Sequence, residues 1–196
     1  FVIYSVQLAY IFLFPFLLQK LYGLKLDTIS LLLIPAYLLA AIVGALSGKI
    51  AKVLGSRQCI TIAMTGIIGS LLLGGFFVKT SVIVFVLSMI VFSSSFALMY
   101  APMLDSCIST IGKEKSGTAI GFYNLILNVA MSIGIAYTAA MMDHSVMRSN
   151  ILGYLNHPDA SMFSNILFVL VLITAFSLFL YWVLVGRKVK MNARGM

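Results

Sequence analysis

Asp105 is the side chain of this sequence best placed for proton chemistry. It lies near the end of a long apolar stretch, eight residues before Lys113, which corresponds to about 12 Å along a helix axis. If that stretch crosses a membrane, a carboxylate within it costs roughly 2.5 to 3.5 kcal/mol and usually faces a cavity or a partner. Asp105 is therefore a candidate for taking up and releasing protons. The alternative is an interfacial carboxylate that water solvates, or that pairs with Lys113 or Lys115.

A second group combines amide and small side chains at helical spacing. Asn124, Asn128 and Ser132 recur every four residues, so one face of a helix carries all three. The same face holds Gly117, Gly121 and Ile135. Such a stripe can line a cavity, where its amides bind a polar ligand or water. It can equally be a packing surface, because small and amide side chains let membrane helices approach and hydrogen-bond.

Further candidates for a binding cavity are Gln7, Tyr37, Tyr100 and Tyr123. Each carries a polar end on an apolar body, and aromatic rings with polar tips suit flat, multi-ring ligands. Tyr4 has the same chemistry, but it comes so early in its apolar stretch that we expect it in the aromatic belt of the membrane interface.

Catalytic and metal-binding patterns are missing from the sequence. It contains no Walker-type phosphate loop and no His-Glu-x-x-His motif, so we expect neither an enzyme nor a cofactor. His144 and His157 lack other soft ligands nearby, and we expect no metal site. Without a nucleotide site, any uphill transport must draw on an ion gradient, which favours a secondary transporter.

The elements that position these side chains are membrane helices. Hydrophobic residues make up 62% of the chain and charged residues 9%, with a mean hydropathy of +1.11, which is far outside the range of soluble domains. Apolar and polar residues do not alternate as in a barrel strand. The sequence therefore predicts an all-α integral membrane bundle. Its six expected spans are about 2–19, 29–49, 59–78, 82–111, 117–142 and 161–185.

The basic residues predict the orientation, because cytoplasmic loops retain Lys and Arg. If residue 1 lies inside, the inner segments hold Lys49, Lys52, Arg57, Lys113, Lys115, Arg187, Lys188, Lys190 and Arg194. The outer segments hold Lys20, Lys25, Lys79 and Arg148. This imbalance places both ends in the cytoplasm, with Tyr181 and Trp182 in the inner aromatic belt. The net charge of +8 is then mainly a topology signal, and nucleic-acid binding is not expected.

The stretch GKIAKVLGSR, residues 48–57, joins the second and third spans. Small residues such as Gly48 and Gly55 are expected to allow a tight reversal. The stretch resembles the loop Gly-x-Leu-Ala-Asp-Arg-x-Gly-Arg-Arg/Lys of the major facilitator superfamily, in which Gly48, Gly55 and Arg57 match a gating motif. Lys52 stands where the family has an acidic residue. In this family the motif is usually complete in the first six-helix half and incomplete in the second. The replacement at Lys52 therefore suggests a C-terminal half.

Three longer stretches extend the resemblance. FPFLLQKLYGLKLDTIS and its continuation, and APMLDSCISTIGKEKSGTAIGFYNLILNVAMSIGIA, resemble fourteen-helix drug/proton antiporters. SMFSNILFVLVLITAF, with Ser164 and Asn165, is similar to the last helix of Gram-positive tetracycline/proton antiporters. The resemblance implies one six-helix half of a major-facilitator fold in a bacterial plasma membrane, with the N-terminal half absent. It also implies proton-coupled export of a lipophilic drug, with tetracycline the best single expectation, by alternating access.

Two alternatives remain open at the level of sequence. The chain could be a six-helix protein that dimerises to form a complete transporter. It could also be a membrane scaffold or assembly subunit that transports nothing and uses the same helices for packing.

Overall fold

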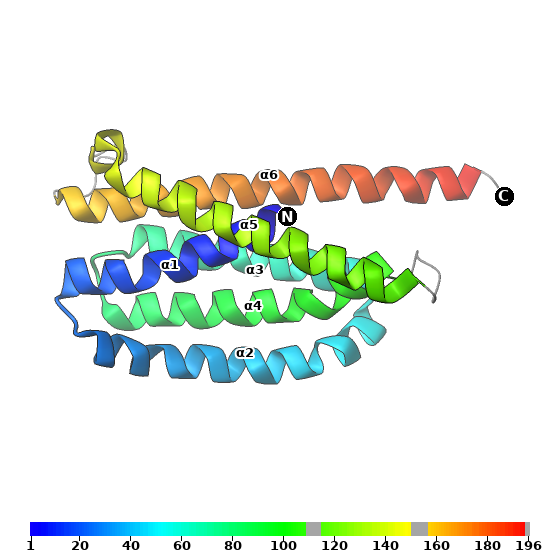
Figure 1. The fold of residues 1–196 in the computed structure, drawn as a ribbon, viewed down its shortest axis with the longest axis horizontal. Coiled ribbons are helices and arrows are strands. Elements are labelled where there is room, and N and C mark those ends of the chain that lie inside the picture. The colour runs from blue at the N-terminus through cyan, green and yellow to red at the C-terminus, as the bar shows by residue number, and fades with distance from the viewer. Residues whose placement is uncertain (109–114, 150–156, 195–196) are drawn as a thin grey trace.

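The computed structural model describes residues 1–108, 115–149 and 157–194. Within these ranges the chain forms six long α-helices and one short 3-10 turn, η2, and it contains no strand (Figure 1). The elements are α1 (Val2–Tyr22), α2 (Leu26–Leu54), α3 (Ser56–Phe76), α4 (Val82–Ile108), α5 (Ser116–Asp143), η2 (Ser145–Arg148) and α6 (Pro158–Arg194).

Each of the six α-helices is long and apolar enough to cross a membrane. This confirms the all-α membrane fold that composition and hydropathy predict. The longest helix, α6, has 37 residues, or about 55 Å at 1.5 Å per residue. The hydrocarbon core is only about 30 Å thick, so part of α6 must lie outside it. The C-terminal end of α6 continues past the other helices (Figure 1). The basic residues Arg187, Lys188 and Lys190 lie in that continuation.

The connection between α2 and α3 is shorter than the sequence suggested. Helix α2 runs on to Leu54, so Gly48 and Lys52 are helical rather than part of a loop. No strong helix breaker interrupts residues 49–54, and the helix therefore continues. Gly55 alone makes the reversal with a φ of 84°, a value that favours glycine. A Cβ atom at Gly48 would meet nothing within 4 Å, so no close approach explains that glycine.

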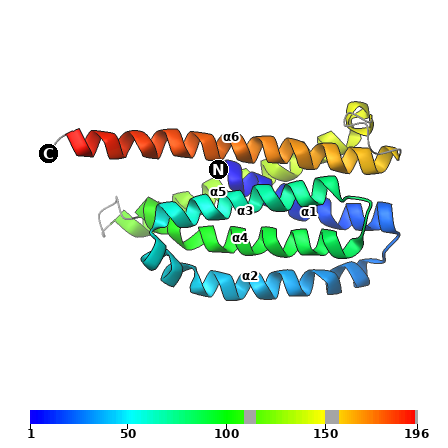
Figure 2. The ribbon, with the colours of Figure 1, turned by 180° about the vertical axis from the view of Figure 1, so that it is seen from behind.

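Each helix packs against a small number of neighbouring helices. Helix α4 packs against both α2 and α3, while α6 packs against α3 and α1, and α5 packs against α1. Figure 2 shows α3 between α6 and α4 from behind. This arrangement leaves α2 and α5 each with one main neighbour.

An aromatic core joins α1 to α4. Tyr10, Phe14, Phe85 and Phe92 are among the largest fully buried side chains. The rings of Phe14 and Phe85 stack with centroids 5.0 Å apart. The Tyr10 hydroxyl and the Ser88 hydroxyl hydrogen-bond at 2.8 Å, so the one polar end within this core has a partner.

Small and polar residues fix two further helix contacts. Gly134 on α5 lies directly against the backbone of Ser5 on α1, where any Cβ atom would collide with the Ser5 carbonyl group. On α6, Ser164 donates a hydrogen bond to the Gly75 carbonyl oxygen at 2.8 Å. The Asn165 amide donates to the carbonyl oxygens of Met147 and Ser149, both at 2.9 Å. The Ser164–Asn165 pair thus ties α6 to α3 and to the segment around η2.

Burial distinguishes two pairs of helices. We call α1 and α3 the packed helices, because about half of each span is buried inside the bundle. We call α2 and α5 the open helices. Helix α2 buries only Ile29, Ala36 and Ser47, and α5 buries only Leu127, Ala130, Gly134 and Thr138.

Candidate functional site

Three aromatic residues from three helices meet inside the bundle. The hydroxyl groups of Tyr4 on α1 and Tyr123 on α5 hydrogen-bond at 3.0 Å. The edge of the Tyr4 ring also meets the Phe96 ring of α4, with centroids 5.0 Å apart. Only 2% of the Tyr4 surface is exposed, whereas Tyr123 is half-buried. We call Tyr4, Phe96 and Tyr123 the tyrosine cluster.

The tyrosine cluster lies well within the bundle and not at its end. Phe96 falls close to the middle of α4, which runs from Val82 to Ile108. The belt position expected for Tyr4 is therefore wrong. Helices α4 and α5 extend past the beginning of α1 (Figure 1) and cover Tyr4 on two sides. Sequence reasoning missed Phe96, because a phenylalanine in an apolar run carries no signal of its own.

The amide stripe lies on the exposed side of α5. Asn124, Asn128 and Ser132 are all exposed. The Asn128 amide donates to the Asn124 carbonyl oxygen at 2.9 Å, and the Ser132 hydroxyl donates to the Asn128 carbonyl oxygen at 2.9 Å. The stripe therefore does not pack against another helix among the described residues. Each amide retains further donor and acceptor capacity for a ligand or water.

The other expected cavity residues are distributed over three helices. Gln7 lies three residues after Tyr4 on α1 and is half-buried. Tyr100 lies one turn after Phe96 on α4 and is 44% exposed. Tyr37 is 45% exposed on α2, which packs mainly on α4. The structure thus places Gln7, Tyr100 and Asn124 within a turn of the tyrosine cluster along their helices, and it places Tyr37 on a separate helix.

Asp105 lines a cavity of about 350 Å³ between α2 and α4. The cavity is also lined by Gly48, Ala51, Lys52, Ser56, Ala101 and Pro102. A carboxylate and an ammonium group therefore face one space, although Lys52 replaces the acidic residue of the family pattern. Lys113, one expected partner of Asp105, lies outside the described residues. Pro102 lies in α4 one turn before Ser106, whose hydroxyl donates to the Pro102 carbonyl oxygen at 2.7 Å.

Arg57, the last residue of the expected gating motif, lies elsewhere. Its guanidinium carbon lies 5.0 Å from the centroid of the Trp182 ring on α6, a distance at which a cation is attracted to the face of an aromatic ring. Arg57 does not line the cavity of Asp105. The three motif residues thus have different surroundings. Gly48 lies in α2, Gly55 forms the turn, and Arg57 contacts Trp182 of α6.

Within residues 1–108, 115–149 and 157–194, no three His, Cys, Asp or Glu side chains come together in a way that could hold a metal ion. The polar chemistry of the described bundle therefore consists of hydroxyl, amide and isolated charged groups.

The sequence pattern of the major facilitator superfamily matches residues 1–135 of the 196. The chain belongs to the major facilitator superfamily. Members of this superfamily are membrane transporters rather than enzymes, so this member is a multi-pass membrane transporter. No curated protein and no solved structure matches the chain.

Proposed function

We propose that this transporter exports lipophilic drugs in exchange for protons, and that tetracycline is among its substrates. The observation that carries the proposal is the tyrosine cluster beside the amide stripe. The Tyr4 and Tyr123 hydroxyls, at 3.0 Å from each other, offer polar groups within an apolar bundle. Asn124 and Asn128 add exposed amide groups on α5, the helix that carries Tyr123. A flat, multi-ring compound with several hydroxyl or amide groups fits such a combination of rings and hydrogen-bonding groups.

The chain supplies one six-helix bundle of the complete transporter in this proposal, and a second bundle covers the open helices. The exposed sides of α2 and α5 support it, because Tyr37, Asn124 and Asn128 lie there. The incomplete motif, in which Lys52 replaces the acidic residue of the family, supports an assignment of this chain as the C-terminal bundle. Alternating access then consists of the two bundles rocking about a site near the bilayer midplane.

Proton coupling is assigned to Asp105. Asp105 lines the same cavity as Lys52, so in this proposal the charged carboxylate is attracted to the ammonium group across the cavity between α2 and α4. Protonation removes that attraction and favours separation at this end of the bundle. A proton shifts the balance between two conformations when it binds one of them more tightly than the other. In this proposal Asp105 binds the proton more tightly in the conformation in which α2 and α4 are separated.

The orientation in this proposal follows the distribution of basic residues. Lys49, Lys52 and Arg57 lie near the ends of α2 and α3 that meet at Gly55. The beginning of α5 with Lys115 and the basic end of α6 lie at the same end of the bundle (Figure 1). The proposal places this end in the cytoplasm of a bacterial cell, with the protein in the plasma membrane.

The proposal is tested by uptake of tetracycline into everted membrane vesicles that contain the intact protein. We expect uptake to require an imposed pH gradient. Asp105→Asn should lower the gradient-driven uptake at least tenfold, because an amide cannot exchange the proton. Asp27→Asn, an exposed substitution at the opposite end of α2, serves as the matched control and should leave uptake unchanged.

Two outcomes would contradict the proposal. Unchanged uptake and an unchanged pH profile in Asp105→Asn would remove Asp105 from the coupling. Absence of any gradient-driven uptake, with normal insertion of the wild-type protein, would favour the scaffold alternative. The mass of the native product on a denaturing gel separates a two-bundle transporter from a six-helix protein that dimerises.

A further inference from the structure

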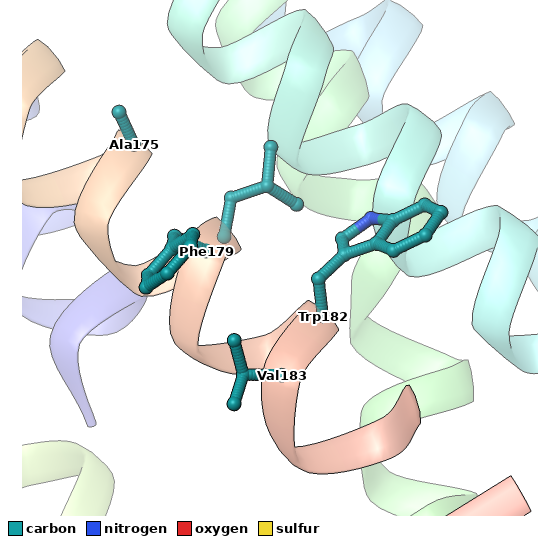
Figure 3. A pocket seen from close by; sticks show the side chains of 5 residues that line it. Ala175, Phe179, Trp182 and Val183 are labelled. Atoms are coloured by element: carbon teal, nitrogen blue, oxygen red, sulfur yellow. The ribbon is translucent and has the colours of Figure 1, made fainter. Parts of the chain in front are cut away.

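Three cavities lie along the C-terminal half of α6, before its basic end. One, of about 530 Å³, is lined by Ala175, Leu178, Phe179, Trp182 and Val183. Figure 3 shows Phe179 and Trp182 extending from α6 to the two sides of this cavity. All five lining side chains are apolar or aromatic, so the cavity is an apolar groove along the surface of the helix.

A second cavity adds polar groups on the other side of Trp182. It has a volume of about 500 Å³ and is lined by Arg57, Gln58, Thr61, Ile62 and Trp182. The guanidinium, amide and hydroxyl groups of Arg57, Gln58 and Thr61 come from the first turns of α3. Trp182 therefore lies between an apolar cavity and one that also contains polar side chains.

A third cavity, of about 550 Å³, lies between the helices and also contains Arg57. Its walls include Ile60, Met64, Met99 and Met103, which are flexible or branched apolar side chains. Arg57 thus forms part of two cavities and lies 5.0 Å from the Trp182 ring. Neither Asp nor Glu is among the residues that line the three cavities.

Arginine in this setting is suited to a phosphate group. Its planar guanidinium group offers five N–H donors that match phosphate oxygens, and stacking on an aromatic ring leaves those donors free at the edge. The cation–π contact with Trp182 also restricts the Arg57 side chain before a ligand arrives, which lowers the entropy lost on binding.

The surrounding charge favours an anionic partner. Lys49 and Lys52 are exposed near the same end, and α6 carries Arg187 and Lys188 beyond the cavities. Basic residues outnumber acidic ones more strongly at this end, where Asp105 and Glu114 are the acidic residues of the sequence, than at the opposite end, where Asp27, Asp143 and Asp159 lie beside Lys20, Lys25, Lys79 and Arg148. An anionic membrane surface attracts the net positive charge of this end, and this general attraction is spread over all of its Lys and Arg side chains.

We propose that Arg57 and Trp182 form a binding site for the headgroup phosphate of an anionic phospholipid. The phosphate binds at the edge of the Arg57 guanidinium group, with Gln58 and Thr61 beside it. An acyl chain follows the apolar groove of Phe179 and Val183 along α6. This site is separate from the tyrosine cluster and from the Asp105 cavity, so its test does not depend on the transported substrate.

Trp182 is the only tryptophan of the chain and reports directly on the site. The intact protein, with any tryptophan outside residues 1–196 replaced by phenylalanine, is placed in nanodiscs of unlabelled phosphatidylcholine with increasing fractions of a dibrominated lipid, which quenches tryptophan fluorescence on contact. We expect dibrominated phosphatidylglycerol to reach half-maximal quenching at a fraction about fivefold lower than dibrominated phosphatidylcholine does. Equal fractions for the two lipids in the wild-type protein would overturn the proposal.

Variants distinguish this site from general attraction to a charged surface. Arg57→Gln should abolish the preference for phosphatidylglycerol, whereas Lys52→Gln, which removes an equal charge outside the three cavities, should retain it. Arg57→Lys keeps the charge and should retain part of the preference if Arg57→Gln does not fold. Preference that survives in Arg57→Gln, or that Lys52→Gln loses equally, would contradict the proposal. Inorganic phosphate added to the nanodiscs should not displace the lipid, and equal competition by phosphate would assign the site to a soluble ligand.

Discussion

The packed helices and the open helices use similar residues in different ways. In the packed helix α1, the Tyr10 hydroxyl bonds across to Ser88 on α4. In the open helix α5, Asn128 and Ser132 bond to carbonyl oxygens of their own helix. Polar groups thus connect two helices in the first case and remain within one helix in the second.

This difference separates structural from functional polar residues. A buried hydroxyl without a partner costs free energy. In the packed helices such a group finds its partner on a neighbouring helix, as Tyr10 does, or on its own helix, as Ser70 does when it donates to the Ile67 carbonyl oxygen at 2.7 Å. The open helices have no such requirement toward the rest of the bundle. Their exposed amides can bind a substrate or a neighbouring helix without disrupting the fold. Substitutions of buried groups should therefore affect stability, whereas substitutions of the exposed amides of α5 should affect function.

The contact between Gly134 and Ser5 is expected to give the largest effect on stability. It is the one place where the open helix α5 meets the packed helix α1 backbone to backbone among the described glycines. Gly134→Ala should lower the free energy of unfolding by about 3 kcal/mol, because overpacking against a rigid backbone group cannot be relieved by a rotamer change. The thermal unfolding midpoint in detergent measures the loss.

Gly121→Ala on the same helix provides the control. A Cβ atom at Gly121 would meet nothing within 4 Å, so this variant should be as stable as the wild type or slightly more stable. Equal midpoints for Gly134→Ala and the wild type would mean that α1 and α5 separate easily, and the distinction between packed and open helices would fail at this point.

Much of the fold could be predicted from the sequence, because bilayer thickness constrains the length of an apolar helix. The six helices follow from this constraint alone. Their ends did not, since Gly48 and Lys52 lie beside a glycine-containing stretch that suggests a loop, whereas residues 49–54 have adequate helix propensity. The single-residue turn at Gly55 is a property of backbone geometry that composition does not reveal.

The candidate site was less accessible to sequence analysis. The spacing of Asn124, Asn128 and Ser132 correctly placed them on one face, but it did not tell whether that face was exposed. The contact of Tyr4 with Phe96 and Tyr123 joins residues far apart in the chain. Hydropathy measures depth only along a single helix, and it contains no information on how far α4 and α5 extend beyond α1.

The hydrogen bond of Tyr10 offers a second, smaller test of the packed helices. Tyr10→Phe removes the bond to Ser88 but keeps the buried ring, and Ser88 still donates to the Phe85 carbonyl oxygen at 2.7 Å. We expect a loss of about 1 kcal/mol in the free energy of unfolding. Tyr37→Phe on the open helix α2 is the matched control and should leave the unfolding midpoint unchanged. A loss of equal size in both variants would show that exposure does not separate their roles.

The smallest effect on stability, and the clearest on function, is expected at Asn124. Asn124→Leu leaves the Asn124 carbonyl oxygen in place, so the bond from the Asn128 amide is kept. The Asn124 side chain is exposed on α5. The free energy of unfolding should therefore change by no more than about 0.5 kcal/mol. If the side chain contacts substrate, the apparent KM for tetracycline uptake should rise severalfold while the protein level stays constant.

Val129→Leu, another exposed substitution on α5, controls for side-chain size and should alter neither quantity. A fall in protein level that matches the fall in uptake would instead make Asn124 a packing residue, and α5 would then resemble the packed helices.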